Sequence, residues 1–162
     1  MFTDSDQGTS VDTRCSHGCY VIMFVGAAVA HRSKSNKSVM LSSAADEYYD
    51  SEASEGWCEL AYIRGILKDF YGAECPSTPT YIDNQACIAM AKMPVFSEKQ
   101  KHIPIRVCHL RECCSNKMVE LRPIGTRFEV ADIGTKALPE PAFVILRNVL
   151  LGLTTFSDLQ GM

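Results

Sequence analysis

The pattern of apolar and polar positions in the first part of the chain predicts an antiparallel meander of three strands. The first expected strand starts almost at the first residue, which indicates that its beginning is short or missing, as in a segment of a longer polypeptide. The apolar run that follows a polar loop is long enough for a central strand, with Gly26 as a bulge. The expected elements here are a strand at Phe2–Asp6, a loop at 7–17, a strand at Cys19–Ala30, a polar turn at Ser33–Lys37 and a strand at Ser38–Leu41.

Helical periodicity then dominates, interrupted by two short strands. Ser42 or Ser43 can cap a long helix that ends before Gly72, since Trp57 and Leu60 fall on its apolar stripe. The later expected elements are a strand at 80–82, a helix from Ala86 to Lys92, a helix from about Ile103 to Asn116, an edge strand at Met118–Ile124 stopped by Pro123, a helix at Phe128–Ala137 and a last helix from Pro139 to Gly152.

This order of elements predicts one α/β domain. A meander followed by alternating strands and helices implies a mixed five-stranded sheet, with three antiparallel strands, two parallel strands and helices on its faces. We expect this domain to occupy residues 1–153 and the tail at 154–162 to lack order.

Four carboxylates fall at the ends of these predicted elements. Asp4 ends the first strand, Glu47 opens the long helix, Asp83 ends the fourth strand and Asp132 begins a late helix. If the fourth strand lies beside the first, all four can converge at one edge of the sheet, where open α/β sheets place their chemistry.

Each of these acids has an ordinary alternative. Asp83 or its neighbour Asn84 can simply cap the following helix, and acids in a first helical turn favour the helix dipole. Asp6 competes with Asp4, and Asp46 competes with Glu47, for the functional position.

Composition is that of an ordinary globular protein. The 162 residues are 46% hydrophobic and 22% charged, with a net charge of −3. The longest apolar run is too short to span a bilayer and no basic-then-apolar leader precedes it, so we expect a cytoplasmic or nuclear location and no membrane partner. The eight cysteines are scattered among elements that can fold without disulfides, and we expect them to be reduced.

An ordered series of short motifs resembles the C-terminal ribonuclease H domain of copia-type retrotransposon Pol polyproteins. The resemblance covers Phe2 to about Leu153, and no single motif is specific by itself. The motifs are Asp4-Ser5-Asp6, Asp12-Thr13-Arg14, Leu41-Ser42-Ser43, Glu47-Tyr48, Asp83-Asn84-Gln85, Ala91-Lys92, Val95-Phe96, Lys101-His102-Ile103, Ile105-Arg106, Ala131-Asp132-Ile133, Thr135-Lys136 and Leu138-Pro139.

The resemblance implies a ribonuclease H-like fold and a metal-dependent nuclease that hydrolyses the RNA strand of RNA–DNA hybrids. Asp4, Glu47, Asp83 and Asp132 would then hold two Mg²⁺ ions, or Mn²⁺, because two hard cations need several anionic oxygens. The implied partners are the hybrid and the reverse transcriptase domain of the same polyprotein.

Nucleic-acid contacts are expected next to this site. A basic block surrounds His102 and His109, and charged runs of this kind are also common on solvated helix faces. The candidates for contact with nucleic acid are Asn84, Gln85, Lys101, His102 and Arg106.

Two other interpretations remain open. The family usually has Trp where this chain has Gln7, a core Trp near His31, and Leu where this chain has Gly134, which is compatible with an inactive retroelement remnant that keeps the fold as a structural or nucleic-acid-binding module. The third interpretation is a zinc-stabilised domain built on Cys15, His17 and Cys19 or on 108–114, although neither spacing matches a zinc knuckle.

Overall fold

A single mixed sheet organises the protein. The computed structural model describes residues 1–6, 16–36, 53–92 and 105–160. In the order β3-β2-β1-β4-β5, β1 is antiparallel to β2 and β2 to β3, whereas β4 is parallel to both β1 and β5. The strands are β1 (Phe2–Asp6), β2 (Ser16–Phe24), β3 (Ala27–Asn36), β4 (Thr78–Ile82) and β5 (Val119–Pro123). This confirms the expected five-stranded sheet and the ribonuclease H-like α/β class.

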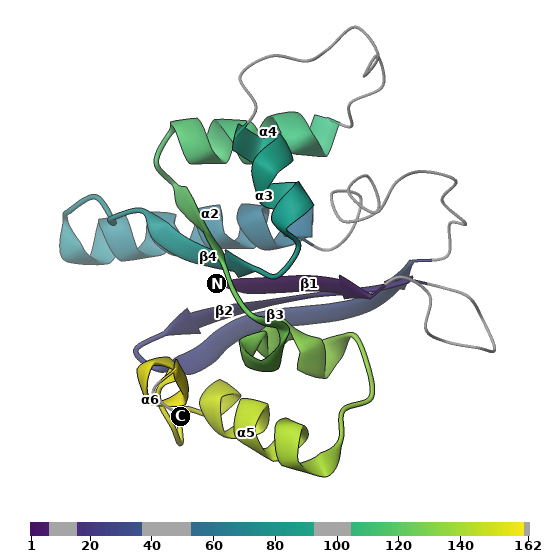
Figure 1. Ribbon diagram of the computed structural model, residues 1–162. Helices are drawn as coiled ribbons and strands as arrows, with labels where there is room; N and C mark the ends of the chain where they lie inside the picture. Colours follow the sequence, from purple (N-terminus) through teal and green to yellow (C-terminus); the bar gives the residue numbers. More distant parts are fainter. Residues whose placement is uncertain (7–15, 37–52, 93–104, 161–162) are drawn as a thin grey trace, which may run out of the picture.

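Helices cover both faces of the sheet. In Figure 1, α2, α3 and α4 lie on one side of the strands, and α5 and α6 lie on the other with the two short 3₁₀ helices. Their bounds are α2 (Ala53–Tyr71), α3 (Gln85–Lys92), α4 (Ile105–Ser115), η1 (Thr126–Phe128), η2 (Val130–Gly134), α5 (Glu140–Leu150) and α6 (Phe156–Gln160).

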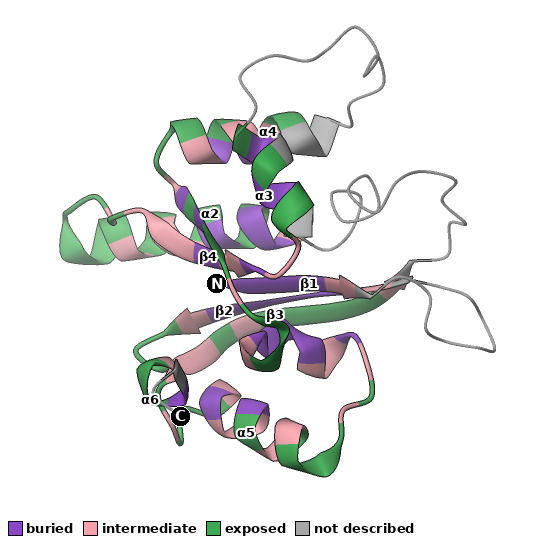
Figure 2. Cartoon of the chain, in the orientation of Figure 1, coloured by how far each residue is buried: buried purple, intermediate pink, exposed green. Residues whose placement is uncertain are grey.

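Two hydrophobic clusters follow from the alternation of side chains along the strands. On β2, Tyr20 and Ile22 face the cluster under α2, while Cys19 and Val21 face the cluster under α5. Trp57 is fully buried in the first cluster, and Figure 2 shows the buried positions concentrated where helices meet the sheet. The central strands are therefore covered on both faces.

The hairpin formed by β2 and β3 differs from the sequence-based expectation. The apolar run Cys19–Ala30 is not one strand, because the chain turns at Val25 and Gly26, with φ angles of 51° and 88°. Both positive values fit a two-residue hairpin turn that matches the twist of its strands. The bulge lies at Ile22/Met23 instead of Gly26, and the segment from Ser33 to Asn36 continues β3 instead of turning.

The long helix ends where expected. The end of α2 at Tyr71 is followed by Gly72 with φ 66°, whose N–H donates to the Lys68 carbonyl at 2.8 Å. Glycine favours this left-handed C-terminal position because it has no Cβ. The expected strand at Ser38–Leu41 and the expected helix start at Ser42 or Ser43 lie outside the described residues.

The final third of the chain contains two further differences. The segment expected as a helix at Phe128–Ala137 forms the short helices η1 and η2 instead. The expectation of a disordered tail is wrong for Phe156–Gln160, which forms α6. The centroid of the Phe156 ring lies 4.9 Å from that of Phe2 and 5.0 Å from that of Tyr81. This aromatic packing holds α6 against the sheet.

Candidate acidic site

The parallel pairing of β1 and β4 brings two predicted acids to the same edge of the sheet. Asp4 lies on β1 and is 5% exposed, and Asp83 directly follows Ile82, the last residue of β4. Both strands run toward this edge, and the charge of Asp4 raises the pKa of Asp83. The two carboxylates are thus within electrostatic range of each other.

The helix η2 brings a third acid to this edge. Asp132 is 2% exposed, and the Thr135 hydroxyl that follows η2 donates to Asp4 Oδ2 at 2.5 Å. Lys136 Nζ lies 2.8 Å from Asp132 Oδ1. Asp4 and Thr135, which are 131 positions apart in the sequence, therefore belong to one polar cluster.

Close packing of η2 on the meander requires a glycine. A Cβ at Gly134 would lie 2.5 Å from Cys19 Sγ and 3.3 Å from Ser33 Cβ. The Ser33 hydroxyl donates to the Gly134 carbonyl at 2.5 Å, which fixes η2 across β3. Leucine, which the resemblance would favour at this position, does not fit this approach, so Gly134 is part of the local packing and not a defect in it.

Burial makes these carboxylates harder to ionise. Desolvation raises the pKa of Asp132 to about 7, with a further increase from the Asp4 charge and an opposing effect of the hydrogen bond from Lys136. Burial also raises the pKa of Asp83, and Asp4 adds to this effect while Lys136 opposes it. Carboxylates crowded in this way favour either a bound proton or a nearby cation.

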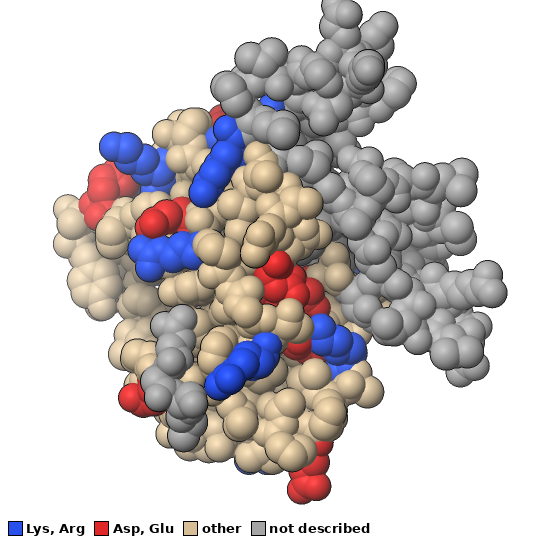
Figure 3. All heavy atoms as spheres, in the orientation of Figure 1, with Lys and Arg blue, Asp and Glu red and all other residues tan. Residues whose placement is uncertain are grey.

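Lys136 supplies positive charge to this cluster. Burial alone would lower its pKa, but the hydrogen bond to Asp132 and the charges of Asp4 and Asp83 outweigh burial and raise it. Lys136 belongs to the Thr135-Lys136 motif noted in the sequence. Its proximity to Asp4 could not be predicted, because the two residues lie far apart in the chain. In Figure 3, acidic atoms gather near the centre of the face shown, with basic side chains beside them.

Glu129 is a site-adjacent acid that the sequence analysis missed. Its side chain is fully buried, and Glu129 Oε1 accepts a hydrogen bond from the Ala131 N–H at 3.1 Å, which caps η2. Oε2 has no hydrogen-bond partner among the described residues. Desolvation, together with the charges of Asp4, Asp83 and Asp132, raises the pKa of Glu129 well above its ordinary value. In the sequence, Glu129 is an isolated acid before two apolar residues, and this pattern does not indicate that it is buried beside the site.

The structure resolves which residue caps α3. Asn84 Oδ1 accepts hydrogen bonds from the N–H groups of Ala86 at 3.0 Å and Cys87 at 3.2 Å. Asp83 is therefore not needed as the cap, and its carboxylate instead receives a weak contact from the Thr126 hydroxyl at 3.5 Å.

The remaining predicted site residues are only partly described. Gln85 is exposed at the start of α3, and Arg106 lies in the first turn of α4 with its side chain outside the described part. Glu47, Lys101 and His102 lie outside the described residues altogether.

The oxygen-rich donor set suits a hard cation, although the described part forms only a portion of a site. Across 1–6, 16–36, 53–92 and 105–160, no three His, Cys, Asp or Glu side chains group closely enough to hold a metal ion. Asp4, Asp83 and Asp132 interact electrostatically and carry only oxygen donors, which Mg²⁺ prefers. The metal would therefore need further ligands, such as water or a residue outside the described part.

The seven described cysteines are free thiols, and Cys15 lies outside the described residues.

Among the described helices, none combines the length and the apolar character needed to cross a membrane.

The sheet order and the helices on both faces of the sheet define a ribonuclease H-like α/β fold. Neither a known family profile nor a solved structure matches the chain.

Three plant polyproteins are similar to the chain over most of its length. It is 28% identical to the retrovirus-related Pol polyprotein from transposon TNT 1-94 of Nicotiana tabacum, over 92% of the chain and 11% of that polyprotein. It is 26% identical to those from transposons RE2 and RE1 of Arabidopsis thaliana, over 88% of the chain and 10% of each. The chain is therefore similar to a segment of retrotransposon Pol polyproteins and spans about a tenth of their length.

Proposed function

We propose that the protein is a metal-dependent endonuclease that hydrolyses the RNA strand of RNA–DNA hybrids, as the ribonuclease H domain of a copia-type retrotransposon polyprotein. The observation that carries this proposal is the cluster at the carboxyl ends of β1 and β4. There, buried Asp4 interacts electrostatically with buried Asp132 on one side and with Asp83 on the other.

Asp4, Asp83 and Asp132, together with Glu47, would hold two Mg²⁺ ions. When bound, the metal pair supplies a water activated for attack on the phosphodiester and charge stabilisation for the leaving 3′ oxygen. Mn²⁺ has the same preference for oxygen ligands and could substitute.

The neighbouring residues keep the carboxylates in place. The Thr135 hydroxyl orients Asp4 through its 2.5 Å hydrogen bond, and Glu129 fixes the start of η2 on which Asp132 lies. Lys136 offsets part of the negative charge and is the described side chain that a metal ion would displace from Asp132. These contacts hold the acids in position before substrate arrives.

Hybrid recognition would use groups around this edge. Asn84, Gln85, Lys101, His102 and Arg106 are the candidates for contact with the nucleic-acid backbone. Selectivity for RNA would come from its 2′-hydroxyls and the groove shape, because these features distinguish a hybrid from a DNA duplex without base readout. In a polyprotein, the reverse transcriptase domain would supply the hybrid, in the cytoplasm or nucleus.

A labelled RNA–DNA hybrid tests the proposal. We expect the protein to cut the RNA strand with Mg²⁺, to be inactive in EDTA, and to lose at least about 100-fold in rate on Asp83→Asn substitution. Asp69→Asn, which changes an exposed acid on α2, is the matched control and should leave the rate unchanged.

The opposite outcome has a specific meaning. If the folded wild-type protein cuts no faster than Asp83→Asn with either Mg²⁺ or Mn²⁺, the endonuclease proposal is wrong. Hybrid binding without cutting would then favour the inactive nucleic-acid-binding module.

A further inference from the structure

The neighbours of β1 extend beyond its first residue. β1 has five residues and β2 has nine. In the register of the sheet, Phe2 lies opposite Val21 on β2 and beside Tyr81 on β4. A line drawn from β1 past Met1 would therefore run between the end of β2 and the start of β4.

A groove of about 260 Å³ lies at this place. Its walls come from the end of β2, the start of β4 and the apolar side of α2, and most of its surface is apolar. Phe24 at its border is 41% exposed. The lining residues that matter here are Met23, Phe24, Ile63, Leu67, Thr78 and Pro79.

One wall of the groove is held in place by Arg64. Its guanidinium donates to the Pro76 carbonyl at 2.6 Å, the Thr78 hydroxyl at 2.9 Å and the Cys75 carbonyl at 2.8 Å. The segment before β4 is thus fixed to α2 by three hydrogen bonds from Arg64.

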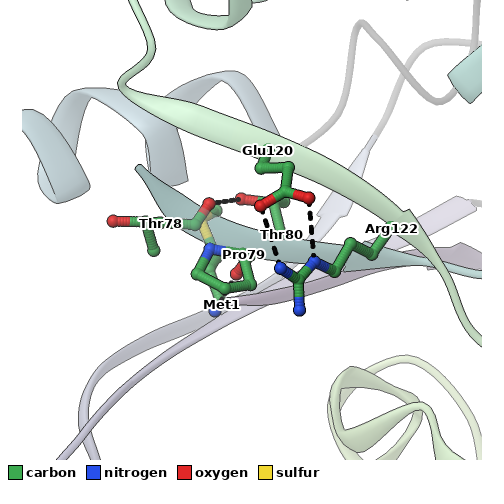
Figure 4. Close-up of polar contacts among 6 residues, drawn as sticks. All are labelled: Met1, Thr78, Pro79, Thr80, Glu120 and Arg122. Carbon is green, nitrogen blue, oxygen red and sulfur yellow. Dashed lines mark hydrogen bonds and ion pairs between the residues drawn. The ribbon is translucent and has the colours of Figure 1, made fainter. Parts of the chain in front are cut away.

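The ladder between β1 and β4 already reaches the first residue. The Tyr81 N–H donates to the Met1 carbonyl at 2.9 Å, and the Met1 amino group donates to the Pro79 carbonyl at 2.8 Å. Figure 4 shows Met1 beside Pro79 on β4. These are successive rungs of a parallel ladder, so the direction of the next residues is set.

A free ammonium group is poorly suited to this place. Burial lowers the pKa of the Met1 amine to about 6, against a smaller opposing effect of the Glu129 charge. A peptide N–H could make the same hydrogen bond to Pro79 without burying a charge.

We propose that this groove receives an extended apolar segment joined to the amino end of β1, which continues β1 between β2 and β4. Met1 belongs to the cluster under α2 and Phe2 to the cluster under α5. By alternation, the second residue before Met1 faces Ile63 and Leu67 in the groove, and the residue immediately before Met1 faces away from α2. This inference does not depend on the proposed nuclease activity.

Two extensions of identical composition test the proposal. One adds Leu-Ser before Met1, which places leucine in the groove, and the other adds Ser-Leu, which places serine there. Both convert the Met1 amine into a peptide N–H, so they differ only in which side chain enters the groove. We expect the Leu-Ser chain to melt about 3 to 8 °C higher than the Ser-Leu chain.

Two further variants separate the filling of the groove from the loss of the buried charge. N-terminal acetylation of the 162-residue chain removes the charge without filling the groove, and it should reproduce only the part of the gain that both extensions share. Leu67→Ala in both extended chains should shrink the difference between them, since it removes part of the groove wall.

Equal melting temperatures for the two orders would overturn the proposal. Dimerisation of the 162-residue chain that Phe24→Ser abolishes would also overturn it, because a second copy would then be the occupant.

Discussion

On the carboxyl-end side of β1, Asp4 at the middle of the strand interacts with Asp132 and Lys136, whereas on the amino-end side the Met1 amine, just before the strand, lies among apolar side chains below α2. Two ionisable groups are thus buried only three residues apart. Burial raises the pKa of Asp132 to about 7 and lowers the pKa of the Met1 amine to about 6. In each case desolvation disfavours the charged form.

The two sites differ in what can reduce the cost of burying charge. Several carboxylates gather at the carboxyl end with Lys136 beside them, so a divalent cation can still improve the balance of charge there. At the amino end, the positive charge of the Met1 amine is buried beside an apolar groove, so replacing this amine by a neutral group would stabilise the fold. The first arrangement is suited to binding a cation and the second to continuing a strand.

The largest expected effect is a difference in hybrid cleavage between substitutions of Asp4 and Asp6, the two acids of β1. Asp4→Asn should lower hybrid cleavage at least about 100-fold, about 2.7 kcal/mol of barrier, because a neutral amide binds Mg²⁺ weakly. Asp6→Asn is the matched control on the same strand and should retain most activity. Rates measured at saturating Mg²⁺ check this, and a larger loss for Asp6→Asn would move the site to the alternative acid.

Part of this acidic cluster could be predicted from the sequence. Local periodicity placed Asp4 on the first strand and Asp83 directly after the fourth, and the sheet order brings these two acids near each other. Asp132 was expected at the start of a helix over Phe128–Ala137 but lies in the short helix η2. The contact between Thr135 and Asp4 could not be predicted, because it depends on how η2 packs across β2 and on the small size of Gly134.

The amino end was predicted less well for a physical reason. Alternation cannot locate a turn within an apolar run, and Val25 is an unfavourable residue for the positive φ that the turn requires. The tail was also missed, because α6 is short and depends on the contacts of Phe156 with Phe2 and Tyr81 instead of helix propensity.

As pH rises, Asp132 and the Met1 amine should change the free energy of unfolding in opposite directions. A folded-state pKa of about 7 for Asp132, above its ordinary value of 3.8, means that its stabilising contribution is lost as pH rises from about 4 to 7. A pKa of about 6 for the Met1 amine, below 8.0, means that stability is gained as pH rises from about 6 to 8, by about 2 to 3 kcal/mol for a shift of this size.

In urea unfolding of the metal-free chain, we expect Asp132 to contribute a loss of stability up to about pH 7, to which the raised pKa values of Asp83 and Glu129 add. N-terminal acetylation isolates the amine: the acetylated chain should be the more stable one near pH 6, and this advantage should shrink as pH rises to 8. Asp132→Asn should weaken the fall below pH 7. An advantage of the acetylated chain that does not change between pH 6 and 8 would show that the amine is not the group that titrates.

A smaller effect should come from the lysine of the acidic site. Lys136→Met removes the cation paired with Asp132, so the metal-free protein should lose stability and Mg²⁺ should restore more of it. We expect the Mg²⁺-induced increase in melting temperature to at least double relative to wild type. Lys68→Met is the control, since it breaks an exposed pair with Glu74. An unchanged Mg²⁺ response in Lys136→Met would show that Lys136 does not compete with the ion.

The smallest expected effect concerns the hairpin next to the amino end. Val25 is 88% exposed with φ 51°, a conformation that a β-branched residue adopts at a cost and that asparagine tolerates. Val25→Asn should therefore stabilise the fold by about 1 kcal/mol, raising the melting temperature by about 2 to 4 °C, without changing cleavage. Val29→Asn makes the same chemical change on β3, where Val29 is 53% exposed, and should give no gain because a strand favours valine. An equal gain from both substitutions would mean that lower surface hydrophobicity, and not relief of backbone strain at the turn, is the cause.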